Sequence, residues 1–192
     1  MGSPGDTGRV LRKLILTTAV ASLALAATPA PSSAAGLIAP TAACPNQTSL
    51  LAAAPVQEAA MLCMANYARE QSGLGELEPT GSLEESARDK ARDILDCDTF
   101  SHDACGREFT YWMRESGYTE AQCWRVGENL AWGAGEYGTV RSIFRAWMRS
   151  PEHRANLLGN YTQTGIDLRT GALGDVAGTR VWAEHFGDSR CS

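Results

Sequence analysis

The sequence predicts an α+β domain in which helices cover a largely antiparallel sheet. From residue 55 onward, segments with helical spacing are interleaved with segments in which apolar and polar residues alternate. The last two strand-like segments, 164–169 and 179–186, are joined by a glycine-rich turn without an intervening helix, which predicts an antiparallel hairpin. These two observations favour strands that pair antiparallel over strands connected by crossover helices.

Two helices are expected at the start of the domain. From 56 to 71, small and apolar residues recur at helical spacing after Pro55, which suits the first turn of a helix. From 83 to 95, apolar residues form a stripe typical of a core-facing helix. Ser82 and Glu85, at the start of this stripe, predict a capping box.

The remaining elements are shorter. A third helix is expected from 107 to 115, and alternation predicts a strand from 124 to 132. A fourth helix begins at about Thr139 and carries apolar residues on one face. Ser150 and Pro151 are then expected to cap and begin one more turn of helix.

The N-terminus predicts export. Three basic residues between positions 9 and 13 precede an apolar stretch, and small residues follow at 34 and 35. We predict a signal peptide over 1–34 and not a transmembrane anchor, which needs roughly 20 apolar residues. Residues 35–54 form an Ala/Pro-rich lead-in, expected to be loosely held and tied down by Cys44, and 55–192 form a single domain. We expect the protein to be secreted, either free outside the cell or at the cell wall.

Charge narrows the range of partners. Removing the signal peptide leaves about 158 residues with 14 basic and 21 acidic side chains, a net charge of −7. That length suits one domain with a sizeable core. An acidic domain repels phosphate, so we expect no nucleic-acid partner.

All six cysteines follow the predicted signal peptide, and an even number in an exported chain predicts disulfides. A thiolate metal site is the alternative, but the sequence has no CxxC pair. Six cysteines allow 15 pairings. We predict Cys97 with Cys105, because that bond would stiffen the loop that carries His102. The candidates are Cys44, Cys63, Cys97, Cys105, Cys123 and Cys191.

His102, Glu128 and His153 lie at or near the ends of predicted elements. If the fold brings them together, two imidazoles and one carboxylate form a cleft able to hold Zn²⁺, another divalent metal or a small polar ligand. The alternative is that Glu128 only orients a histidine and the trio ties loops to the sheet. The third histidine, His185, faces away from Trp182 on its strand, and we expect it at the surface or the flank of the sheet.

Several short segments carry a family resemblance between residues 61 and 186. They are FSH at 100–102, GENLA at 127–131, AWM at 146–148, SPEHR at 150–154, GI at 165–166 and WAEHFG at 182–187. In order and spacing they resemble the CAP superfamily (cysteine-rich secretory proteins, antigen 5, pathogenesis-related 1) in its bacterial secreted form.

This resemblance implies a three-layer α/β/α sandwich with a cleft lined by two histidines and two acidic residues. His102 and His153 match the histidines and Glu128 the first acid. The second acid would fall at Ser150, so this chain lacks it, and Glu152 is a candidate to replace it in part. Asn129 is expected to hold the strand end through backbone hydrogen bonds, and Asn156 to pin the short helix.

We therefore expect a secreted binding or interaction module whose partner is a protein, a glycan or a lipid. A metal-dependent extracellular hydrolase of peptide or glycan is the first alternative, with Glu152 as the candidate base. A lipid or sterol binder is the second. Whether the protein is an enzyme stays open at this point.

Overall fold

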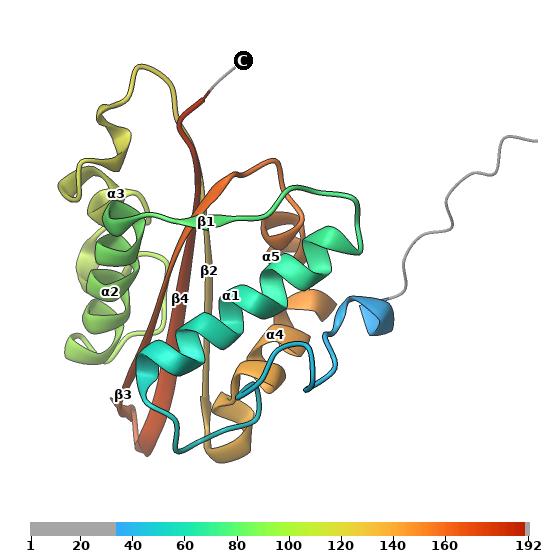
Figure 1. Cartoon of the computed structure of the whole chain (residues 1–192). Helices are drawn as coiled ribbons and strands as arrows, with labels where there is room; N and C mark the ends of the chain where they lie inside the picture. Colours follow the sequence, from blue (N-terminus) through green and yellow to red (C-terminus); the bar gives the residue numbers. More distant parts are fainter. Residues whose placement is uncertain (1–33, 191–192) are drawn as a thin grey trace, which may run out of the picture. The chain divides into compact units, whose positions relative to one another are not determined.

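The computed structural model describes residues 34–190 (Figure 1). The predicted signal peptide lies outside these residues apart from Ala34, and stays a prediction. In the described part of the chain, no helix is long and apolar enough to cross a membrane. The main elements are α1 (Ala54–Glu70), β1 (Glu78–Pro79), α2 (Gly81–Asp96), α3 (Tyr111–Glu115), β2 (Arg125–Ala134), α4 (Val140–Arg149), α5 (Pro151–Leu157), β3 (Gln163–Leu173) and β4 (Val176–Asp188).

The strands form one sheet in the order β1-β3-β4-β2. The predicted C-terminal hairpin is confirmed, since β3 and β4 pair antiparallel and Gly174 takes a positive φ of 55° in the turn between them. β2 pairs antiparallel with the other edge of β4. The short β1 runs parallel to β3, so the sheet is mixed in this one detail.

Helices cover both faces of the sheet, as Figure 1 shows, and the predicted three-layer sandwich is confirmed. α1, α4 and α5 pack on one face around Trp182 and Phe186 of β4. α2 packs on the other face against Val181 and Ala183. Alternate residues of β4 therefore face two separate buried cores.

The contact between α2 and the sheet is very close at one point. A Cβ built on Gly165 of β3 would lie 2.0 Å from the backbone carbonyl carbon of Leu83. Only a glycine lets the first turn of α2 approach the strand this closely. This approach sets how near the side chains of α2 come to the strands beneath them.

Two helix starts differ from the prediction. Thr80, not Ser82, precedes α2, and no side-chain hydrogen bond caps the helix, so the predicted capping box is wrong. The reason is that the Thr80 N–H donates to Thr164 O in the sheet, and the helix begins directly afterwards. α3 begins at Tyr111 because Arg107 is extended and its guanidinium bonds Asp93 at 2.9 Å.

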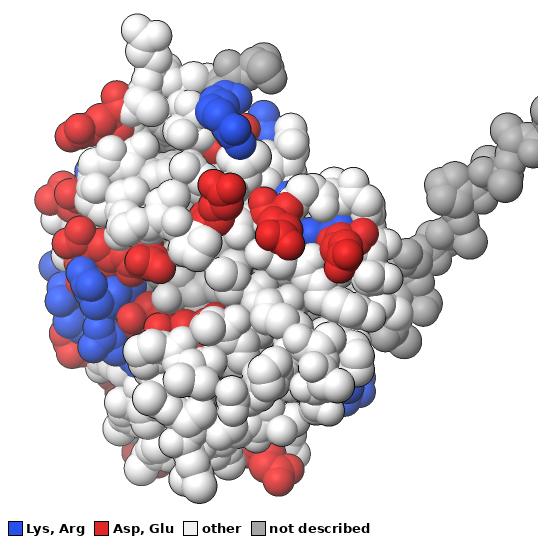
Figure 2. All heavy atoms as spheres, viewed as in Figure 1, with Lys and Arg blue, Asp and Glu red and all other residues white. Residues whose placement is uncertain are grey.

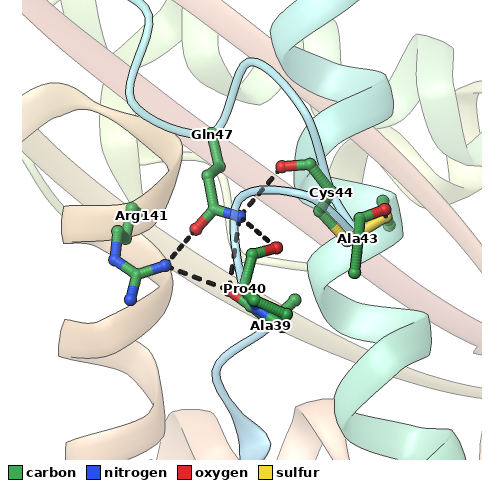
Figure 3. Close-up of a disulfide and its surroundings, with 7 residues drawn as sticks. Ala39, Pro40, Ala43, Cys44, Gln47 and Arg141 are labelled. Atoms are coloured by element: carbon green, nitrogen blue, oxygen red, sulfur yellow. Dashed lines mark hydrogen bonds between the residues drawn. A yellow bond between two sulfur atoms is a disulfide. The ribbon is translucent and has the colours of Figure 1, made fainter.

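The lead-in is packed against the domain and is not loose (Figure 3). Leu37, Ala39 and Cys44 are buried in the same core as α1. The side-chain amide of Gln47 donates to the carbonyls of Ala39, Pro40 and Cys44, and its oxygen accepts a hydrogen bond from Arg141 of α4. The lead-in therefore connects two helices of one layer.

The disulfide prediction is confirmed where the structure describes it. Cys97 bonds Cys105, the pair expected from the sequence, and Cys44 bonds Cys63 of α1. Cys123 is also in a disulfide, and no cysteine of the described residues is free. Cys191 lies outside the described residues.

Candidate functional site

His102 and Glu128 are brought into direct contact. His102 lies in the loop that follows α2, which the Cys97–Cys105 disulfide closes, and Glu128 lies in β2. The ring Nδ1 of His102 is 2.5 Å from Glu128 Oε1. The Glu128 side chain is almost fully buried, with 1% exposed, whereas 55% of the His102 side chain is exposed. The pair therefore places an accessible imidazole on a buried carboxylate.

The second oxygen of Glu128 binds a residue that the sequence did not point to. His185 of β4 lies directly opposite Glu128 in the register of the sheet, and its Nε2 is 2.8 Å from Glu128 Oε2. On its other side, His185 Nδ1 is 2.7 Å from the hydroxyl of Ser86 in α2.

The expectation that His185 lies at the surface or sheet flank is wrong, because the residue is completely buried. Alternation correctly put its side chain on the face opposite Trp182, but that face is covered by α2. The one sequence feature that could have indicated this burial is Ser86, a polar residue on the sheet-facing side of α2 that bonds His185.

His153 is close to this pair without touching its carboxylate. Within residues 34–190 it makes no hydrogen bond to Glu128, but it lies near enough for the charge of His102 to affect it. Its backbone carbonyl accepts a 3.0 Å hydrogen bond from the Asn129 side chain, and its ring lies 6.5 Å from that of Trp147. The three predicted residues therefore share one neighbourhood, but only two of them are bonded to each other.

Asparagines hold α5 against β2, as expected. Asn156 donates to the carbonyl of Glu128 at 3.1 Å and to the Asn129 side chain at 2.9 Å. The helix that carries His153 is thus fastened to the strand that carries Glu128. Gly127 permits this contact, since a Cβ there would lie 2.7 Å from the hydroxyl oxygen of Tyr161.

The protonation equilibria of the site differ from residue to residue. Burial alone would raise the pKa of Glu128, but the hydrogen bonds from His102 and His185 outweigh it, and the pKa is lowered. The hydrogen bond to Glu128 raises the pKa of His102 despite partial burial. Burial, followed by the charge of His102, lowers the pKa of His153. The site therefore combines a buried carboxylate, an imidazole with a raised pKa and an imidazole with a lowered pKa.

A buried lysine supports the loop. Lys90 of α2 is fully buried, and its ammonium donates to the backbone carbonyl of His102 at 2.6 Å. Nothing in the sequence marked it, since it stands among surface charges of an amphipathic helix. Because the contact is charge-assisted, it fixes the loop more firmly than a neutral hydrogen bond would.

Glu152, the candidate catalytic residue, is exposed at the first turn of α5. It lies near enough to His153 for its charge to act on that imidazole. Ser150, where the second acid was expected, precedes α5 and joins it to α4. The structure provides no second buried carboxylate at these positions.

Direct coordination of one metal by His102, Glu128 and His153 does not fit this arrangement. Both Glu128 oxygens already accept hydrogen bonds from imidazoles. Among residues 34–190, no group of three or more His, Cys, Asp or Glu side chains is placed to hold a metal ion. Only the two imidazoles would be left as direct ligands to a metal, and Glu128 would then orient one of them, a common supporting role at metal sites.

Comparisons with known proteins agree with this fold. The family model "CAP: Cysteine-rich secretory protein family" matches residues 62–184. The uncharacterized protein YkwD of Bacillus subtilis is 30% identical over 142 residues, which are 72% of this chain and 50% of that protein. The chain thus spans about half the length of this curated relative.

Solved structures with the same fold include three bacterial proteins. An outer surface protein of Borrelia burgdorferi has a TM-score of 0.55 at 20% identity and covers 66% of this chain and 87% of its own. An extracellular protein containing an SCP domain from Bacillus anthracis has a TM-score of 0.55 at 22% identity, and the match covers 69% of this chain and 40% of that protein. A cysteine-rich secretory protein of Staphylococcus aureus has a TM-score of 0.52 at 20% identity, and the match covers 71% of this chain and 39% of that protein. At these identities the likeness shows the fold alone.

Proposed function

The chain belongs to the cysteine-rich secretory protein (CAP) family, and from this premise we propose that it is an extracellular binding module that takes a small polar ligand or a divalent metal at His102 and His153. The observation that carries the proposal is the His102–Glu128 pair. A buried carboxylate holds one ring nitrogen of a side chain that is 55% exposed. The histidine is therefore both fixed and accessible, which a purely structural histidine need not be.

The two imidazoles offer complementary chemistry. Because Glu128 accepts a hydrogen from Nδ1 of His102, Nε2 is the ring nitrogen left for a ligand. The raised pKa of His102 favours the protonated ring, in which Nε2 donates a hydrogen bond. The lowered pKa of His153 favours a neutral ring, which has one acceptor nitrogen. A ligand with both a donor and an acceptor group matches this pair.

A divalent metal would take the same two imidazoles, each in its neutral form. Structural and catalytic zinc sites usually have three or four protein ligands, so water or another small molecule would complete the coordination. Glu128 would keep its hydrogen bond to His102 and hold the ring in place. The described residues supply no third protein ligand. The metal proposal therefore rests on the chemistry of the two imidazole donors and on the family.

Location outside the cell is supported by the disulfides, which persist in oxidising compartments. The printed descriptions of two structural relatives, extracellular and secretory, point the same way. On the face drawn in Figure 2, the basic side chains near α2 lie among acidic ones, and Arg88 and Arg92 pair with Glu85 and Asp89. This mixture supports a partner other than nucleic acid.

The described site does not favour the hydrolase alternative over binding. Ser86, His185 and Glu128 have the hydrogen-bond distances of a serine hydrolase triad. However, Ser86 is fully buried, so no substrate reaches its hydroxyl. Glu152 is exposed, and only its proximity to His153 connects it with the site.

Isothermal calorimetry tests the proposal, with Zn²⁺ as the probe and metal-stripped mature protein as the receptor. We expect one equivalent of zinc to bind, and binding to disappear in His102→Ala and in His153→Ala. Asp175→Asn, an exposed carboxylate in the turn after β3, is the control for nonspecific binding and should bind zinc like the parent. Equal binding by the parent and both histidine variants would place the metal elsewhere and refute this part of the proposal.

A second titration addresses polar ligands without a metal. Acetate and methylammonium are added in the presence of a chelator while the ring ¹⁵N signals of His102 and His153 are recorded. Saturable shifts at either ring would support a polar-ligand site. If neither zinc nor these probes act on the two rings, the proposed binding role is wrong.

A further inference from the structure

Four side chains from four different elements form one continuous hydrogen-bonded chain. It runs from Ser86 of α2 through His185 of β4 and Glu128 of β2 to His102 in the loop after α2. The successive distances are 2.7, 2.8 and 2.5 Å. Exposure rises along it, since Ser86 and His185 are fully buried and most of the His102 side chain is exposed.

The direction of the hydrogens follows from the carboxylate. An imidazole nitrogen lies within hydrogen-bond distance of each of its two oxygens, and an ionised carboxylate only accepts hydrogen bonds. His102 Nδ1 and His185 Nε2 must therefore both carry hydrogens. The Ser86 hydroxyl serves His185 Nδ1 in either protonation state, because a hydroxyl both donates and accepts.

His185 thus determines how Glu128 can be oriented. The two imidazoles approach different oxygens of one carboxylate, and its plane is set by both contacts together. Without His185, Oε2 would be a buried charged oxygen with no donor, which is costly. The carboxylate would then rotate or admit water, and its hydrogen bond to His102 would weaken.

A role limited to core stability explains this arrangement less well. Apolar side chains of similar volume in place of His185 and Glu128 together would fill the same space under α2, and replacing a whole set of buried polar groups by well-packed apolar ones is often neutral or stabilising. The side chains of β4 on either side of His185 on this face are apolar or absent, at Ala183 and Gly187. A fully buried imidazole at this one position is directed at the carboxylate that holds His102.

We propose that His185 is a positioning residue for the ligand site, which through Glu128 keeps a hydrogen on Nδ1 of His102 and so presents Nε2 to the ligand. The purpose of this arrangement rests on the proposed function. The arrangement itself is a property of the free protein and is tested without ligand. Ser86 completes the set by holding the second nitrogen of His185.

The test uses the mature protein with ¹⁵N-labelled histidine, and the readout is the ring N–H signals in the absence of ligand. In the parent we expect hydrogens on Nδ1 of His102 and on Nε2 of His185, both protected from exchange with water. His185→Leu keeps the volume and removes the donor, and should speed exchange of the His102 Nδ1 hydrogen at least about 10-fold, since a buried charge-assisted hydrogen bond contributes about 1.5–3 kcal/mol. His185→Gln retains an amide N–H at the corresponding distance along the side chain and should restore protection.

Glu184→Gln is the matched control. It changes the neighbouring residue of the same strand, whose side chain lies on the other face of the sheet with Trp182, and should leave the His102 signal unchanged. Thermal unfolding of each variant separates a general loss of stability from the specific change at His102. Unchanged His102 exchange in a folded His185→Leu variant would overturn the proposal.

The parent protein alone also provides a decisive result if His185→Leu does not fold. If the His185 ring carries its hydrogen on Nδ1 and none on Nε2, it cannot donate to Glu128, and the inference is overturned. Zinc titration distinguishes this inference from the proposed function. A parent that shows the expected ring signals but binds no probe upholds the positioning role and refutes the function. Where zinc does bind, His185→Leu should lower its affinity about 10-fold or more.

Discussion

Replacing Glu184 with glutamine should change the stability of the protein relative to the parent increasingly in favour of the variant as the pH rises. Glu184 lies in β4 and is fully buried. The Thr164 hydroxyl donates to its Oε1 at 3.5 Å, and Oε2 has no hydrogen-bond partner in the described residues. Burial raises the pKa of Glu184 to about 8, although the Thr164 hydrogen bond and the charge of Arg69 act in the opposite direction.

The sign follows from comparing the folded and unfolded states. Below the unfolded pKa of 4.5 the group is protonated in both states and has no effect on the pH dependence. Between 4.5 and about 8 the unfolded chain has lost the proton and the folded chain keeps it. The free energy of unfolding therefore falls by about 1.4 kcal/mol per pH unit, or about 3 kcal/mol between pH 4.5 and 7. Above about pH 8 the loss is complete, at about 5 kcal/mol.

Glutamine has no such proton, so the difference in unfolding free energy between the variant and the parent should increase by about 3 kcal/mol from pH 4.5 to 7. Unpaired amide hydrogens of the glutamine would shift the whole difference by a constant amount, about 1–3 kcal/mol, without changing its slope. Urea unfolding followed by tryptophan fluorescence at several pH values measures this slope. Glu115→Gln, at an exposed glutamate, controls for the loss of one charge. A difference for Glu184→Gln that is constant with pH would refute the reasoning.

Two further predictions follow from the packing. Gly165→Ala should destabilise the protein by about 3 kcal/mol or more, because its Cβ would meet the backbone of Leu83 at 2.0 Å, whereas Gly171→Ala meets only the flexible end of a leucine side chain at 3.0 Å. Urea midpoints of the two variants check this, and equal losses would contradict it. Lys90→Met should speed amide exchange in the loop around His102 at least about 10-fold, since the loop loses a charge-assisted hydrogen bond at 2.6 Å. Exchange rates that stay at the parent's value would show that the lysine does not hold the loop.

The sequence by itself determined most of the segments that become helices and strands, because amphipathic periodicity depends only on the order of side chains along the chain. Such local patterns predict the hairpin of β3 and β4, α4 after Thr139 and the short α5 that begins at Pro151. The even number of cysteines and the motif around Glu128 can likewise be recognised without knowledge of the fold.

Tertiary structure alone decided what covers each face of the sheet, and with it the composition of the site. Alternation shows that His185 and Trp182 face opposite sides, but it does not show that α2 buries the side of His185. The contacts of His185 with Ser86 and Glu128 join residues 99 and 57 positions apart, so no local pattern encodes them. The start of α2 was decided in the same way, since pairing of Thr80 with β3 overrides the local capping signal. Long-range packing therefore gave Glu128 its two imidazole partners, and the order of residues gave only the candidates.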